Sequence, residues 1–488
     1  MAALLFLTTP VESRRKAPGQ RAQRVLKAKL MRMRRHRRTP RAAVHLMNLG
    51  LINQRLPKGA LKGFADEVSR LRGLHPLAHY GLDRLKAHLA AKRGRFGEAV
   101  KYFAKRGHVI RMAVTGPFGG PGNGNLDRAF GPEKVDGLRK SSRFNRKNGT
   151  VGWRLLPGLD RFGRVQPSMM VRPLTGGAVY LVAALELRRA GVVAFRLGTS
   201  RGYKLWVGRT LIAKKDVKRA VSPDQDAYAV KLPKGLHVVK VKLTSDRGIW
   251  PLYLRVTALD GGALKGVRWV ADLTEMERAS ATMGPAGSPR SQYRHGESLG
   301  KLVTVQRYLE AQLDKRPKNA PLRKEMVRFL LARTPEDPRK EKARAHALEL
   351  VRVEDKPANY RLLARASRKP ADRLAALRTA LKKGPRDPDT LLVMSRHAFG
   401  RGKLNLAEKY LRRCLEERPG FVQARLLAAE ILSARGLHVL ARKKLVKIQK
   451  EVGWRQDLAQ LLAEAHRSSG KKKEAQGVLE TLVREDVA

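Results

Sequence analysis

Residues 388–488 contain a pattern that recurs every 34 positions, and this period constrains the fold more than any other feature of the sequence. Repeats of about 20 to 50 residues are typical of stacked supersecondary units that bury their apolar sides against each other. Glycine permits a tight turn, small residues let two helices approach, and leucine fills the seam. We therefore expect three stacked helix hairpins and no strand here. The recurring positions are a small residue (Ser395, Ala429, Ala463), a glycine (Gly402, Gly436, Gly470), an alanine (Ala407, Ala441, Ala475) and a leucine (Leu411, Leu445, Leu479).

The pattern continues more weakly outside this segment. In the unit before residue 388, Arg373 occupies the small position, so the match there is incomplete. The partial matches are Leu377, Ala380 and Pro385 in that unit, Leu309, Leu313 and Pro317 further upstream, and Ala87, Gly94, Ala99 and Phe103 in a separate hairpin at 85–107.

These offsets resemble the tetratricopeptide repeat family, clearly over 388–488 and more weakly upstream and at 85–107. The resemblance implies a concave groove lined by the first helix of each hairpin, which binds a protein or peptide partner. Because the groove residues carry both signs of charge, a peptide is favoured over a polyanion as the ligand. On this register the groove residues are Arg396, Phe399, Gln423, Glu430, Gln460, Glu464 and Arg467.

Between residues 109 and 265 the pattern changes to short runs rich in Val, Leu and Tyr, separated by Gly, Pro or Asp. Such runs are typical of strands in an antiparallel sandwich. Their order resembles the galactose-binding-like or protective-antigen-type jelly-roll modules embedded in bacterial tetratricopeptide proteins. Relatives that bind sugar or calcium carry acidic residues in the turn that here reads Thr199-Ser200-Arg201-Gly202. Two carboxylates, Asp224 and Asp226, are too few for a calcium site, so we expect no metal.

Three aromatic residues of this segment are candidates for a ligand platform. Tyr203, Trp206 and Trp250 could stack against a sugar, with Asp224 and Asp226 beside them. The alternative, which we favour, is that they form the core and rim of a sandwich. Neighbouring residues of a strand point to opposite faces, so Leu205 and Trp206 cannot both lie in the core.

The chain is strongly basic, with 103 Lys and Arg against 42 Asp and Glu and a net charge of +61. Such a field attracts polyanions. Residues 14–41 contain 13 basic and no acidic residues, which favours a solvated arm or a frayed basic helix. Aromatic residues make up only 6%, and we find no fingerprint of a known nucleic-acid-binding module.

The motifs of common enzymes are not found. No Lys follows the glycines of GGPGNGN, no GxSxG elbow occurs, and no Glu completes a metal motif at His75 and His79. The lone cysteine, Cys414, falls on the second helix of a repeat, where a buried thiol is expected. We therefore expect a protein without cofactor or enzymatic activity. The start of the chain has no basic residues before its apolar run and makes a poor signal peptide, which leaves the cytoplasm and the periplasm or cell envelope open.

The resulting prediction is a multidomain α+β protein in which helical hairpins flank an antiparallel β-sandwich. Its function would be that of an interaction scaffold. The alternatives are binding of a polyanion or nucleic acid through the basic surface and binding of carbohydrate as a cell-envelope protein. The expected parts are a basic arm (1–41), a helical part with one hairpin (42–108), the sandwich (109–265), a linker (266–300) and the repeat array (301–488).

The polyanion alternative gives a salt-dependence prediction. If residues 14–41 neutralise several DNA phosphates, log affinity falls against log salt with a slope near about −0.9 per phosphate. Deleting this segment should flatten the slope in a fluorescence titration. A preference of more than about a thousandfold for a selected over a random DNA would instead establish specific recognition.

Overall fold

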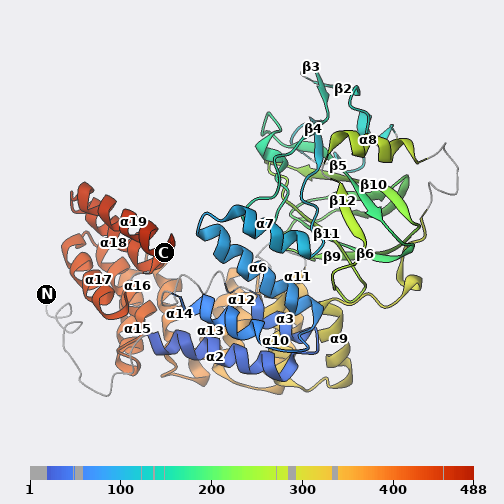
Figure 1. The fold of residues 1–488 in the computed structure, drawn as a ribbon. Coiled ribbons are helices and arrows are strands. Elements are labelled where there is room, and N and C mark those ends of the chain that lie inside the picture. The colour runs from blue at the N-terminus through green and yellow to red at the C-terminus, as the bar shows by residue number, and fades with distance from the viewer. Residues whose placement is uncertain are drawn as a thin grey trace.

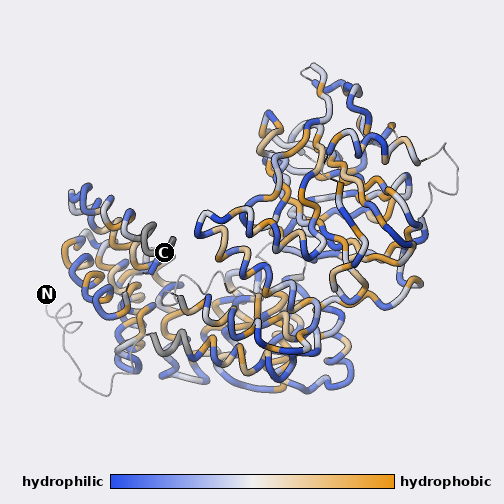
Figure 2. The backbone as a smooth tube through the Cα atoms, in the orientation of Figure 1, coloured by the Kyte–Doolittle hydropathy of each residue, from blue (hydrophilic) through white to orange (hydrophobic). Residues whose placement is uncertain are grey.

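The structure is a computed structural model, and its helices and strands form three groups. In Figure 1 the blue N-terminal helices lie between the green sheets and the orange-to-red C-terminal helices. Figure 2 shows hydrophobic residues gathered along the strands, whereas the helices alternate hydrophobic and hydrophilic residues. None of the described helices has the length and hydropathy to cross a bilayer. The structure describes residues 19–47, 49, 59–122, 124–135, 138–147, 149–270, 272–283, 293–331, 339–453 and 455–487.

The C-terminal helices are antiparallel hairpins, as the repeat predicts. The three predicted hairpins are α14–α15, α16–α17 and α18–α19, and no strand occurs among the described residues of 388–487. The helices are α9 (Val305–Lys315), α10 (Ala320–Leu331), α11 (Arg339–Val353), α12 (Pro357–Ala366), α13 (Pro370–Lys383), α14 (Pro388–Phe399), α15 (Leu404–Glu417), α16 (Val422–Ala434), α17 (His438–Val452), α18 (Gln456–Ser468) and α19 (Lys472–Val487).

The recurring residues occupy the positions that the repeat assigns to them. The turn glycines Gly402, Gly436 and Gly470 have φ angles of 71°, 78° and 76°, which favour glycine over other residues. The recurring small residues and alanines are all buried. Leu479 of α19 differs from Leu411 and Leu445, which are buried, since it is 39% exposed.

The N-terminal helices form a core of their own, and the basic segment is part of it. Leu26, Leu30 and Met33 of α2 are buried in a cluster shared with α3, α5 and α6. Residues 19–36 therefore form a packed helix, whereas we expected a solvated arm or a frayed basic helix. The helices are α2 (Gly19–His36), α3 (Arg41–Leu46), α5 (Ala60–Ser69), α6 (Pro76–Lys92) and α7 (Phe96–Lys105).

Helices α6 and α7 form the hairpin predicted at 85–107. Ala87, Ala99 and Phe103 are buried between them. Phe96, which the sequence suggested as a core residue of this hairpin, is 57% exposed at the start of α7.

The strand-rich segment folds into two larger antiparallel sheets and one hairpin. Residues of both larger sheets, including Leu181 and Val241 from one and Phe195 and Leu254 from the other, share one hydrophobic core. The first sheet has the order β4 (Arg154–Leu155), β1 (Ala113–Phe118), β5 (Gly177–Leu187), β10 (Gly235–Ser245), β7 (Tyr203–Val207), β8 (Thr210–Lys215), with β12 (Val267–Val270) also on β5. The second, the small sheet, has the order β11 (Leu252–Thr257), β6 (Gly191–Thr199), β9 (Asp226–Leu232), and the hairpin is β2 (Arg143–Arg146) with β3 (Gly149–Gly152).

The antiparallel sheets agree with the strand-rich segment expected for 109–265. The assignment to a β-sandwich of the galactose-binding-like jelly-roll type stays a prediction. Short 3-10 helices lie at Gly131–Glu133, Pro167–Met169 and Glu297–Leu299.

The segment 266–300 differs from the expected linker. Its residues include β12, which pairs with β5, and helix α8 (Leu273–Ala281). Val270, Met276 and Ala279 are buried against the outer face of the large sheet, together with Phe144 and Trp153. This part of the chain therefore belongs to the sheet region, and α8 covers a face that would otherwise expose apolar residues.

The helices on either side of the sheet region pack against each other. Arg41 of α3 donates two hydrogen bonds to Glu325 of α10, at 2.6 and 3.0 Å. Val44 and Met47 contact the core of the C-terminal helices, and Val303 contacts the core of the N-terminal ones. The sheet region is thus inserted between two helical segments that form one body.

Ala441 provides a test of the repeat register. It is fully buried at the closest approach of α16 and α17, so Ala441→Leu should overpack the seam and cost about 1–3 kcal/mol. We expect a lower melting temperature by calorimetry. Val439→Leu on the same helix is the control, since Val439 is 52% exposed. Equal melting temperatures for the two variants would contradict the register.

Candidate functional site

A buried charged layer lies between the small sheet and helix α6. Arg196 of β6 and Arg255 of β11 are direct partners in the antiparallel register, and each is 1% exposed. The guanidinium of Arg255 lies 3.8 Å from the ring centre of Tyr80 on α6. Two like charges at facing positions of a sheet repel each other, so this layer needs anions.

Asp224 neutralises one of the two arginines. Arg255 donates from Nε to Oδ1 at 2.8 Å and from Nη2 to Oδ2 at 2.5 Å, a bidentate pair. Burial raises the pKa of Asp224, but the charge and hydrogen bonds of Arg255 outweigh it and bring the pKa to about 2. The backbone of Asp224 has a φ of 52°, rare for a residue other than glycine. The loop before β9 is thus bent to deliver this carboxylate.

Arg196 has no such partner. It donates from Nε to Thr257 Oγ1 at 2.9 Å and from Nη2 to the carbonyl oxygens of Leu259 and Val303, at 3.0 and 2.9 Å. Its Nη1 is buried without a hydrogen bond, and no described carboxylate lies within ion-pair distance of it. Burial lowers the pKa of Arg196 to about 10, so the guanidinium remains charged at neutral pH.

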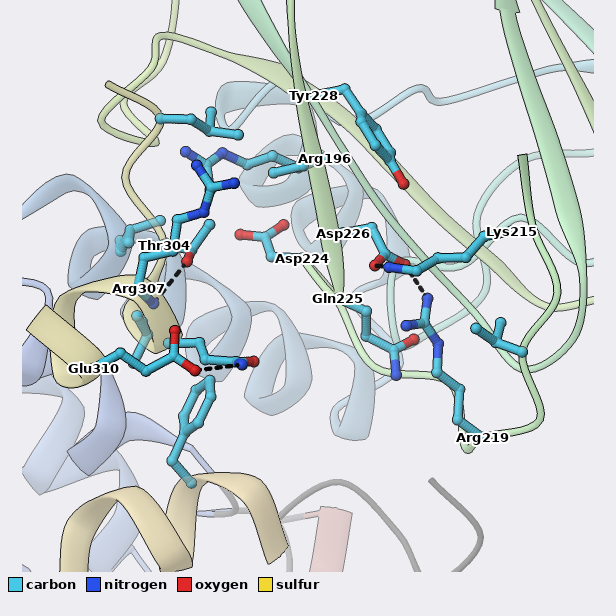
Figure 3. Close-up of a pocket in the computed structure, with 17 residues that line it drawn as sticks. Arg196, Lys215, Arg219, Asp224, Gln225, Asp226, Tyr228, Thr304, Arg307 and Glu310 are labelled. Atoms are coloured by element: carbon cyan, nitrogen blue, oxygen red, sulfur yellow. Dashed lines mark hydrogen bonds and ion pairs between the residues drawn. The ribbon is translucent and has the colours of Figure 1, made fainter. Parts of the chain in front are cut away.

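Arg196 lines a cavity of about 450 Å³ between the small sheet, α6, α9 and α10. Figure 3 shows Arg196, Asp224 and Thr304 on one side and Lys215, Arg219 and Asp226 on the other. Asp226 pairs with Arg219 and with Lys215, whose Nζ lies 2.5 Å from Oδ1. The apolar part of the lining comes from Leu77, Val217, Leu302, Val305 and Phe329.

The candidate aromatic platform is not formed, and two of its three aromatic residues lie in the core, the alternative that we favoured. Tyr203 is fully buried and Trp250 is 1% exposed, and both belong to the core between the sheets. Trp206 lies on the opposite face of the large sheet, where the ammonium groups of Lys204 and Lys240 approach its ring at 5.7 and 5.5 Å. A sugar cannot reach Tyr203 or Trp250, because both side chains point into the core between the sheets. Tyr203 does so from β7, and Trp250 from the segment just before β11.

The carboxylates of Asp224 and Asp226 are likewise unavailable to a sugar, since each forms an ion pair with a buried arginine. The described residues contain no group of three or more His, Cys, Asp or Glu arranged to hold a metal ion. Cys414 is buried, with Sγ 3.2 Å from the carbonyl oxygen of Pro388, and burial raises the pKa of its thiol to about 11. The thiol is therefore protonated and unreactive at neutral pH.

The predicted groove residues lie on the first helices of the hairpins, which are neighbours in space. All seven are exposed or half-buried, and only Glu464 and Arg467 pair with each other, at 2.7 Å. Two further arginines, Arg328 of α10 and Arg365 of α12, occupy the same position of their helices as Arg396 does in α14. Arg365 is out of period, because α12 begins 31 rather than 34 residues before α14. Arg328 keeps the period, at 68 residues before Arg396, but the sequence match to the repeat is too weak in that part of the chain to assign its position.

Asp224→Asn tests the buried pair. Removing one partner leaves two buried arginines without a carboxylate, so the variant should lose about 3–5 kcal/mol of unfolding free energy. Because the folded pKa of Asp224 is depressed, its stabilisation is present above pH 4 and is lost as pH falls towards 2, by about 2 kcal/mol.

Denaturant titrations at pH 7 and through this acid range measure both effects. The wild type should lose stability more steeply than Asp224→Asn between about pH 4 and pH 2. The control is Asp66→Asn, at an exposed position on α5. If Asp224→Asn and Asp66→Asn behaved alike, Asp224 would not be the counter-ion of the layer.

Comparisons with known proteins give partial matches to solved structures. No protein-family model and no curated protein matches the chain. PilW, a widely conserved type IV pilus biogenesis factor, is 21% identical, with 38% of this chain and 87% of that chain covered and a TM-score of 0.32. A tetratricopeptide repeat protein from Parabacteroides merdae is 18% identical (37% and 72% covered, TM-score 0.32), and YrrB, a tetratricopeptide protein with an unusual peptide-binding site, is 13% identical (36% and 91% covered, TM-score 0.28). By its 34-residue period and its stacked hairpins, the C-terminal part of this chain is a tetratricopeptide-like helical repeat array.

Proposed function

We propose that the chain is a non-enzymatic interaction scaffold that binds an extended peptide along the face formed by the first helices of its hairpins. One observation carries the proposal. Five charged residues each lie eight positions after the start of α10, α12, α14, α16 and α18, and four of them have no ion pair with another described residue. This first-helix face consists of Arg328, Arg365, Arg396, Glu430 and Glu464.

The environment of these residues is that of a hollow surface. Arg328 is exposed, yet the protein around it and the charges of Arg32 and Arg365 lower its pKa. Glu430 is half-buried, and burial raises its pKa even though the charge of Arg396 opposes the shift. Side chains that are open to solvent and still lose solvation lie in a concavity. A ligand that enters it would find charges that the protein itself does not neutralise.

The order of the charges along the first-helix face predicts the charge pattern of the peptide. Three arginines follow one another on α10, α12 and α14, and two glutamates follow on α16 and α18. A peptide with an acidic block next to a basic block would match both halves, and the match would fix its direction. Helix α2 lies at the arginine end, since Lys29 and Arg32 interact electrostatically with Arg328.

The test compares two peptides of the same composition. One has its acidic residues in one block and its basic residues in the next, and the other alternates them. Fluorescence anisotropy should show tighter binding of the block peptide. Arg365→Ala and Glu430→Gln should each weaken it about tenfold, which is about 1.4 kcal/mol.

The control is Arg412→Ala, because Arg412 is exposed on α15, the second helix of its hairpin. The proposal fails if the two peptides bind equally well, or if Arg412→Ala weakens binding as much as Arg365→Ala does. The alternative of carbohydrate binding is weakened, since Tyr203 and Trp250 of the candidate platform are buried. The polyanion alternative stays a prediction for the salt titration.

A further inference from the structure

We propose that the cavity beside Arg196 binds a small organic acid whose carboxylate meets the guanidinium of Arg196. This site is separate from the first-helix face. It lies between the small sheet and helices α6, α9 and α10, and no part of the proposed scaffold function uses it.

The first argument is charge. Arg196 and Arg255 face each other in the sheet, and the layer holds one carboxylate, that of Asp224, among its described residues. His108 also lies in the layer, with Nε2 3.0 Å from the Tyr80 hydroxyl, and burial together with Arg255 lowers its pKa to about 3, so it is neutral. Asp224 and the exposed Asp260 act electrostatically on Arg196, but neither lies within ion-pair distance of it, so its charge lacks a paired carboxylate among the described residues. Buried charges are normally paired, and a monoanion would complete this layer.

The second argument is the free hydrogen-bond donor. Nη1 of Arg196 is the one nitrogen of this guanidinium that lacks a partner, while Nε and Nη2 are held by a hydroxyl and two carbonyl oxygens. Leaving a buried donor unsatisfied is costly, and the cost is larger for a charged group. Nη1 is enclosed, so a carboxylate that enters the cavity would reach it with a small shift of the surrounding side chains and would then form a charge-assisted hydrogen bond.

The third argument is that the other charges of the lining are already paired. Asp226 is held by Arg219 and Lys215, and Arg307 pairs with Glu297. Glu310 accepts from Gln306 at 3.0 Å and lies 3.6 Å from Lys342. Among the described lining residues, Arg196 is thus the cation that forms no ion pair.

The cavity also suits the body of such a ligand. Its volume of about 450 Å³ lies within the range of small-molecule sites, and its walls combine Leu77, Val305 and Phe329 with the polar groups of Gln225 and Tyr228. An acid with a compact apolar body would bury that body against the helices and direct its carboxylate to the sheet.

The test uses the full chain and a panel of aliphatic and aromatic monocarboxylic acids, benzoate among them, each paired with its neutral amide. Binding is measured by melting temperature and by isothermal titration. We expect at least one acid to raise the melting temperature while its amide does not, because only the acid carries the charge. Arg196→Gln should abolish the effect, and Arg196→Lys should weaken binding by at least about tenfold.

Lys231→Gln is the matched control, since it removes an exposed cation of β9 in the same small sheet, outside the cavity lining. It should keep the affinity within about threefold. If Arg196→Gln does not fold, the comparison of Arg196→Lys with Lys231→Gln decides. The proposal is overturned if no acid acts at about 10 mM, if amides act as well as acids, or if the Arg196 variants bind like the wild type.

Discussion

The buried pair of facing arginines, Arg196 and Arg255, is the constraint on which the arrangement of the three regions depends. Arg255 is held by Tyr80 of the N-terminal helices and by Asp224 of the sheet region, and Arg196 donates to the carbonyl oxygen of Val303, just before the C-terminal helices begin. Charges in a medium of low dielectric constant hold their partners to narrow geometries, because a misplaced partner leaves a charge uncompensated. A single cross-strand pair therefore fixes where two helical segments meet the sheets.

Acidic residues are scarce in this chain, and the way the structure distributes them explains where function can reside. Carboxylates are used to neutralise cations that packing has buried, such as Arg255 by Asp224, Arg219 by Asp226, and Lys242 by Glu133 at 2.5 Å. Many cations receive no carboxylate, since Lys and Arg outnumber Asp and Glu by 61, and the first-helix face and the cavity at Arg196 are two places where such cations lie. A high net charge makes unpaired surface cations common, but it does not account for an unpaired guanidinium in the interior.

The sequence predicted the parts of the fold whose patterns repeat, and it failed where one residue type serves several environments. The hairpins of 388–488 were predicted because Gly402, Gly436 and Gly470 keep a constant spacing, and the strands because short runs rich in Val, Leu and Tyr are separated by Gly, Pro or Asp. Arg365 was missed because α12 begins three residues out of period, and Arg328 because the repeat pattern is weak around it. Tyr203 and Trp250 were considered as a platform because alternation does not tell which face is covered. In a chain with 103 Lys and Arg, no local signal separates Arg196 from an arginine in solvent.

The contact between Arg41 and Glu325 spans 284 residues of the chain, and it has a consequence for synthesis. Ribosomes add about 5–20 residues per second, so Glu325 emerges tens of seconds after α3. During that interval the first helices are exposed without the C-terminal surface that later covers Val44 and Met47, while the sheets between them can already fold. Once the inserted sheets have folded, they hold the two helical segments close together. The loss of chain entropy when α3 meets α10 is then smaller than it would be across an unfolded connection. The folded sheets thus position the N-terminal helices for contact with the C-terminal helices, which are synthesised last.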